Sequence, residues 1–249
     1  MKKIKFVILI VLEVAWMAVA GILIASAIYS ISYNNKPNNP MLTINVEQYG
    51  KIDIELYPEY APNTVAAIIK LAQNGYYDGK VFYGADGYSV HAGMEKSVID
   101  TSAETESLAQ RTATEDEVTV FDFDKSVESG SEKDYKVTLF GEFSANGHEK
   151  NTLRFEKGTV GLYREVQLEY FGAIEESYNS GSSRFFILTE DLNNLNGLYT
   201  AFGKVENGFD VVQKIKEVKT IQEEGADENS IQFFENVPVI KNYWKIHLN

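Results

Sequence analysis

The sequence contains no cysteine in its 249 residues. This absence excludes a disulfide framework, thiolate metal sites, a cysteine nucleophile and a lipid-modified cysteine anchor. It leaves the redox compartment open, because exported proteins also occur without cysteine. A folded domain of about 210 residues buries roughly 70% of its unfolded surface and needs no disulfide to be stable.

Basic residues are also few. The chain has 23 lysines and arginines against 36 aspartates and glutamates, which gives a formal net charge of −13. Binding to nucleic acid requires clustered basic side chains that neutralise phosphates, so we expect no nucleic-acid partner. The acidity fits a soluble, self-repelling domain outside a cell.

Several catalytic and cofactor motifs are missing. There is no G-x-S-x-G elbow, no P-loop and no glycine fingerprint for a dinucleotide. The three histidines, His91, His148 and His247, do not have the spacing of metal ligands. We therefore expect neither a metal nor a cofactor.

The N-terminus has the pattern of a membrane segment. Residues 1–5 carry three lysines, and residues 4–31 are almost continuously apolar, with one interruption at Glu13. About 20 such residues cross a bilayer as a helix, and the preceding lysines place the N-terminus inside the cell. We expect residues 1–33 to be a single-pass anchor in the cell membrane, with the domain extracytoplasmic. Cleavage after the small residues 25–27, followed by secretion, is the alternative.

Beyond the anchor, we expect a polar linker at residues 34–40 and one folded domain at residues 41–249. Within this domain, residues 95–136 form an acidic insertion with 12 acidic and 5 basic residues and little apolar periodicity. Such a composition indicates either a long surface excursion or a partly disordered segment.

The rest of the domain is rich in expected strands. Apolar and polar residues alternate at 42–46 and 52–56 around Tyr49-Gly50, which predicts a β-hairpin. Helices are predicted from Pro62 to about Gly75 and over 209–215. Further strands are expected at 79–93, 184–188, 199–205 and 237–244. Many strands with two separated helices suggest a β-barrel capped by helices.

Blocks in a fixed order along the chain resemble the cyclophilin family. They lie at residues 52–65, 71–79, 141–147, 158–164, 182–187 and 195–205. Each block is weak alone, but in the family's order they extend the resemblance over nearly all of residues 41–249. The resemblance implies a mainly β fold, a closed antiparallel eight-stranded β-barrel capped by two helices, preceded here by one N-terminal transmembrane helix.

The resemblance implies a peptidyl-prolyl cis-trans isomerase that acts on X-Pro bonds. Uncatalysed rotation about a peptide bond has a barrier of about 18–20 kcal/mol and takes tens of seconds or more at proline. The family holds the proline ring in an apolar pocket and directs an arginine at the proline. No metal, cofactor or covalent intermediate is implied, and the expected partners are proline-containing polypeptide segments.

Several residues at the family's site positions differ in this chain. The catalytic arginine aligns with Gly84, while Arg184 replaces a glutamine. Strand alternation places Arg184 on the face of Phe186, so we expect Arg184 to be the catalytic donor. The tryptophan of the pocket becomes Asn194. The expected substrate-binding residues are Phe82, Tyr88, His91, Tyr163, Arg164, Phe186, Leu195 and Tyr199.

Two interpretations remain open. The first is an isomerase for exported proteins, with activity reduced by the loss at Gly84. The second is a non-catalytic cyclophilin-like module, tethered to the membrane, that binds peptides or proteins. Outside the family, an acidic, tethered surface protein with an unrelated β fold is a third possibility. The sequence makes no prediction of the oligomeric state.

Overall fold

The computed structural model describes residues 39–96, 127–128, 135–136, 138–170, 172–221 and 230–247. The predicted anchor at residues 1–33 and most of the linker lie outside these residues. Within the described part of the chain, no helix is long and apolar enough to cross a membrane.

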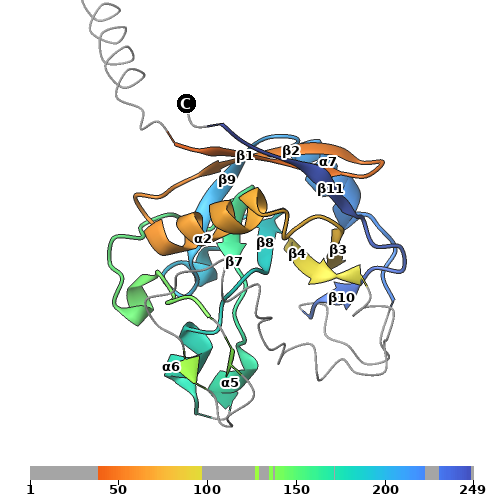
Figure 1. Ribbon diagram of the computed structural model, residues 1–249. Helices are drawn as coiled ribbons and strands as arrows, with labels where there is room; N and C mark the ends of the chain where they lie inside the picture. Colours follow the sequence, from red (N-terminus) through yellow and green to blue (C-terminus); the bar gives the residue numbers. More distant parts are fainter. Residues whose placement is uncertain are drawn as a thin grey trace, which may run out of the picture. The chain divides into compact units, whose positions relative to one another are not determined.

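The domain is built on a curled antiparallel sheet of nine strands (Figure 1). Its order is β10-β3-β4-β8-β7-β9-β2-β1-β11. The strands are β1 (Met41–Val46), β2 (Gly50–Leu56), β3 (Lys80–Ala85), β4 (Ser89–Glu95), β7 (Thr159–Leu162), β8 (Phe185–Leu188), β9 (Ala201–Asn207), β10 (Gln232–Phe233) and β11 (Ile240–His247).

The mainly β prediction is confirmed. Among the described residues the sheet has nine strands instead of the expected eight, and its order ends at β10 and β11, so it is a curled open sheet and not the expected closed barrel. At one end of the sheet, β10 pairs with β3, with Gln232 opposite Ala85 and Phe233 opposite Gly84. Strand β3 also contacts the chain before β11. The N–H of Phe82 donates to the carbonyl of Pro238 at 2.9 Å, and Val81 forms a β-bridge with Val239. These contacts join β3 to the chain just before β11.

The inner face of the sheet forms the main core. In β1 the buried residues alternate, and Leu42, Ile44 and Val46 point inward, as the alternating sequence predicts. They pack in one cluster with residues from most of the other strands, including Phe82 and Phe185. This core fixes the strands whose outer faces carry the pocket described below.

Two helices cover the sheet where the sequence predicts them. The first, α2 (Pro62–Gln73), has proline in its first turn, and the second, α7 (Phe209–Lys216), packs near β2, β3 and β4 (Figure 1). The first turn of α2 has no capping side chain of its own. Instead the buried carboxylate of Glu142 accepts hydrogen bonds from the N–H groups of Asn63 and Thr64, at 2.9 and 2.8 Å.

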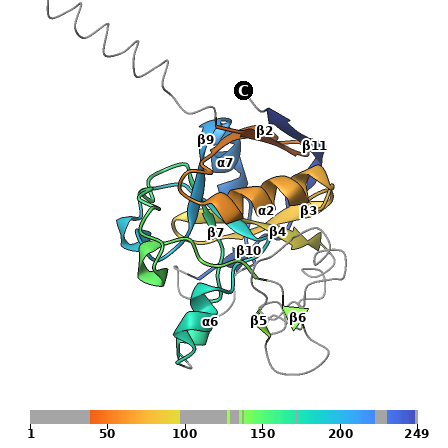
Figure 2. The same ribbon diagram turned by 60° about the vertical axis from the view of Figure 1, so that its left-hand side comes forward.

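Some elements were not predicted. Two short helices, α5 (Gln167–Tyr170) and α6 (Ile174–Tyr178), follow β7 and project from the sheet (Figure 1; α6 also in Figure 2). Two single turns of 3₁₀ helix occur at Ser144–Asn146 and Asn193–Leu195. In the acidic insertion the structure describes a two-stranded pair, β5 (Val127–Glu128) and β6 (Tyr135–Lys136), and most of the remaining insertion lies outside the described residues.

Candidate functional site

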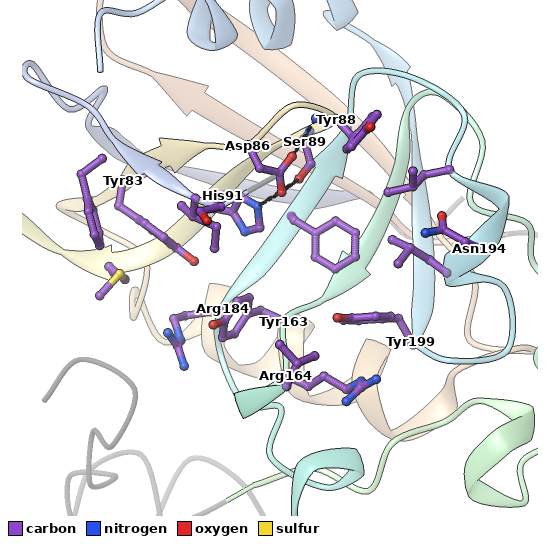
Figure 3. A pocket seen from close by; sticks show the side chains of 18 residues that line it. Tyr83, Asp86, Tyr88, Ser89, His91, Tyr163, Arg164, Arg184, Asn194 and Tyr199 are labelled. Atoms are coloured by element: carbon purple, nitrogen blue, oxygen red, sulfur yellow. Dashed lines mark hydrogen bonds and ion pairs between the residues drawn. The ribbon is translucent and has the colours of Figure 1, made fainter. Parts of the chain in front are cut away.

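A pocket of about 760 Å³ opens on the outer face of β3, β4 and β8 (Figure 3). It is bounded by the turn before β4, by the chain after β7, by the 3₁₀ turn before β9 and by β10. The lining residues are Tyr83, Asp86, Tyr88, Ser89, His91, Met94, Tyr163, Arg164, Val166, Arg184, Phe186, Leu192, Asn194, Leu195, Tyr199, Ser230, Ile231 and Phe233.

Phe186 forms the apolar floor of one end of the pocket. Its ring stacks on Phe155 with centroids 5.8 Å apart, and the ring of Tyr199 meets it edge-on at 5.8 Å. Gly161 lies beneath it, and a Cβ at that position would be 2.4 Å from the Phe186 ring. Leu195 packs against the same cluster. These side chains make a rigid apolar depression.

A polar turn between β3 and β4 fixes His91 beside this floor. The Asp86 carboxylate accepts hydrogen bonds from the N–H groups of Tyr88 and Ser89, at 2.8 and 2.7 Å. It also accepts the Ser89 hydroxyl at 2.8 Å and lies 2.9 Å from Nε2 of His91. Burial acts to raise the pKa of Asp86, but these contacts outweigh burial and lower it. The carboxylate is therefore ionised and accepts only.

The Ser89, His91 and Asp86 side chains do not form a nucleophilic triad. In such a triad the serine and the carboxylate contact opposite nitrogens of the imidazole. Here the Ser89 hydroxyl and the Asp86 carboxylate both lie 2.9 Å from Nε2, while Nδ1 of His91 has no partner among the described residues. The arrangement holds the ring, whose centroid is 5.8 Å from that of Phe186, and does not activate the hydroxyl.

Arg184 lines the middle of the pocket but is paired. Its Nη2 donates to Oε1 of the buried Glu165, and its guanidinium lies 4.2 Å from the ring centroid of Tyr163. Burial acts to lower the pKa of Arg184, but Glu165 outweighs it and the pKa is raised. Burial, with Glu165, also raises the pKa of Tyr163 to about 12. The arginine is thus a fixed cation whose charge is balanced within the site.

Arg164 has a mainly structural set of contacts. Its donors bond the carbonyl of Leu198 at 3.0 Å, the carboxylate of Glu169 at 2.5 Å and the hydroxyl of Ser177 at 2.7 Å. Its guanidinium lies 4.4 Å from the ring centroid of Tyr199. Arg164 therefore fixes Tyr199 and the unpredicted helices α5 and α6, and most of its donors are already used.

The position that aligns with the family's arginine is covered by backbone. Gly84 pairs with Phe233 of β10. A Cβ at Gly84 would lie 2.5 Å from the carbonyl oxygen of Gln232 and 3.0 Å from a side-chain carbon of Ile231. Glycine is thus required at this position, because β10 occupies the space that a side chain would take.

Eight of the nine predicted site residues line this pocket, and Phe82 does not. Phe82 is fully buried in the main core, where its ring lies edge-on to Phe185 with centroids 6.5 Å apart. Sequence reasoning missed Tyr83, the neighbour of Phe82 on the opposite face of β3, although strand alternation carries that signal. It also missed Ile231 and Phe233, because no pattern in the sequence indicates that β10 borders the pocket. No cluster of potential metal ligands occurs among the described residues.

Comparisons of the sequence with known proteins agree on one family. A family model described as "Cyclophilin type peptidyl-prolyl cis-trans isomerase/CLD" matches residues 41–235. A probable peptidyl-prolyl cis-trans isomerase of Brucella suis is 30% identical over 184 residues, which cover 72% of this chain and 73% of the relative. Peptidyl-prolyl cis-trans isomerase B of Bacillus subtilis is 27% identical over 178 residues, covering 72% and 92%. A cyclophilin-type isomerase of Cryptosporidium parvum, crystallised in the presence of the dipeptide Ala-Pro, is 18% identical with a TM-score of 0.47, covering 81% and 99%.

Proposed function

The chain belongs to the cyclophilin-type peptidyl-prolyl cis-trans isomerase family, and we propose that it binds X-Pro segments of exported polypeptides and isomerises them more slowly than a typical member. The apolar floor at Phe186, flanked by Leu195 and Tyr199, is the observation that carries the proposal. A proline ring fits such a depression, since burying it removes apolar surface from water.

We expect a reduced rate because Gly84 stands at the position of the family's catalytic arginine and the backbone of β10 covers it. As the amide twists, its nitrogen loses conjugation and becomes a better hydrogen-bond acceptor, so a donor placed there stabilises the transition state more than the ground state. Losing one such preorganised donor typically lowers a rate by about 10²–10³. The backbone of β10 over Gly84 leaves no room for an arginine there.

Arg184 supports the remaining rate in this proposal. It lines the same pocket as Phe186, and only its Nη2 has a hydrogen-bond partner among the described residues. We expect its other donors to reach a bound peptide. Stacking on Tyr163 and pairing with Glu165 hold the guanidinium in place, which lowers the entropy lost when it donates to a substrate.

A non-catalytic peptide-binding module is the second candidate. It is favoured by one specific observation, the occupation of the arginine position by the Gln232 backbone. On this alternative the pocket binds proline-containing segments and releases them without accelerating isomerisation.

Replacing Phe186 by alanine tests the pocket. We expect the affinity for an X-Pro peptide to fall about tenfold or more, because the apolar floor is removed. Peptide titration followed by NMR and a coupled isomerisation assay on residues 34–249 provide the measurements. Phe209→Ala, the same change in α7 outside the pocket, is the control and should retain the affinity. Equal affinity of the wild type and Phe186→Ala would place the ligand elsewhere.

For the N-terminal segment we propose a membrane anchor with the domain outside the cell. The apolar length of residues 4–31 and the lysines before it support this topology. Protease added to intact cells is expected to digest the domain, while a cytoplasmic marker survives. Complete protection of the domain until the cells are lysed would contradict the topology.

A further inference from the structure

Tyr83 has a buried hydroxyl that the fold leaves without a partner. The residue is 2% exposed, and its hydroxyl forms no hydrogen bond with any described residue. Buried polar groups are nearly always hydrogen-bonded in native proteins, and an unpaired one destabilises the fold. The hydroxyl therefore calls for a functional explanation.

Tyr83 lies at a β-bulge, and alternation along β3 directs its side chain into the pocket. The pairing of β3 with β4 passes from Phe82–Ala92 to Gly84–His91, so Tyr83 is the extra residue in β3. Bulges commonly redirect a side chain beside an active site. Phe82 enters the core, whereas Tyr83 lines the pocket with its hydroxyl on the side of Arg184 (Figure 3).

The strand that covers Gly84 also holds the Tyr83 ring. The ring centroid of Tyr83 lies 6.0 Å from that of Phe233 in β10 and 5.8 Å from that of His91. Met94 and Ile231 complete the packing around it. Thus β10 excludes a side chain at the arginine position and fixes a phenol at the adjacent residue.

The hydroxyl remains a donor throughout the physiological range. Burial raises the pKa of Tyr83, and the opposing charge of Arg184 does not offset burial. A neutral phenol beside a guanidinium is a good hydrogen-bond donor.

We propose that the Tyr83 hydroxyl donates a hydrogen bond to the nitrogen of the isomerising X-Pro bond, in place of the arginine that Gly84 lacks. This inference rests on the proposed isomerase function. In a planar amide the nitrogen is a poor acceptor, so the bond forms only as the amide twists. The hydroxyl is unpaired in the free protein and becomes paired in the transition state.

Tyr83→Phe is the test, because it removes the hydroxyl and keeps the ring packed against Phe233. We expect kcat/KM for an X-Pro peptide to fall about tenfold or more, with peptide affinity unchanged. We also expect the thermal midpoint of unfolding to stay the same or to rise, since an unpaired buried hydroxyl is lost. Tyr49→Phe, in the turn between β1 and β2, is the matched control and should change none of the three quantities.

The outcomes separate this proposal from the function on which it rests. A lower rate with unreduced stability supports the role of Tyr83. A wild-type rate in Tyr83→Phe overturns that role while leaving the isomerase function in place. A parallel loss of rate and stability shows that the hydroxyl is structural and also overturns it. No measurable isomerisation by the wild type overturns the proposed function, and this inference with it.

Discussion

Replacing Gly84 by alanine is expected to destabilise the domain and detach β10, and replacing it by arginine is expected to do so without raising the isomerisation rate. The added Cβ would meet the carbonyl oxygen of Gln232 at 2.5 Å, and backbone cannot rotate away as a side chain can. Overpacking of this kind costs about 1–3 kcal/mol. Because β10 also holds Tyr83 through Phe233, its displacement loosens a second part of the site. Chemical denaturation and amide hydrogen exchange at Gln232 and Phe233 provide the measurements.

Gly79→Ala is the control, because it adds backbone strain without the steric clash expected at Gly84. Gly79 has a φ of +81°, but a Cβ there would meet nothing within 4 Å. We therefore expect only the cost of the left-handed conformation, about 1–2 kcal/mol, and unchanged exchange in β10. A Gly84→Arg variant that stayed stable, kept β10 protected and isomerised at the rate of a typical cyclophilin would refute the steric account of this position.

The sequence predicts the parts of this fold whose pattern is local. The alternation in β1 and in β2 and the proline at the start of α2 each predict one element, and all three elements form as expected. The capping of α2 by Glu142 is a contact between residues 78 and 79 positions apart in the chain. No local pattern carries such a contact, so it becomes visible only in three dimensions.

The candidate site likewise has features that local sequence predicts and features that depend on tertiary contacts. Alternation places Arg184 and Phe186 on one face, and both line the pocket. The partner of Arg184 is Glu165, which lies in a neighbouring segment and cannot be chosen from among 36 acidic residues by sequence alone. The bulge at Tyr83 depends on the register of two strands, which a single-residue shift changes.

Replacing Arg184 and Glu165 by glutamine, singly and together, is expected to change the free energy of unfolding and the turnover in different ways. Glu165 is 2% exposed, and its second carboxylate oxygen has no partner among the described residues. Removing one member of a buried ion pair leaves the other charge uncompensated, which typically costs about 3–5 kcal/mol. We therefore expect Glu165→Gln and Arg184→Gln each to lower the free energy of unfolding. The double variant should regain part of the loss, because no buried charge remains.

We expect the variants to rank differently by turnover than by free energy of unfolding. Arg184→Gln should lower kcat with peptide affinity largely kept, since the guanidinium donates mainly to the transition state. Glu165→Gln keeps the guanidinium and should retain turnover at temperatures where it is folded. The double variant should be more stable than either single variant and yet turn over as slowly as Arg184→Gln. Denaturant unfolding, peptide titration and the coupled assay on all four proteins measure these quantities. If the double variant isomerised at the wild-type rate, Arg184 would be only a structural partner of Glu165 and would contribute nothing to the rate.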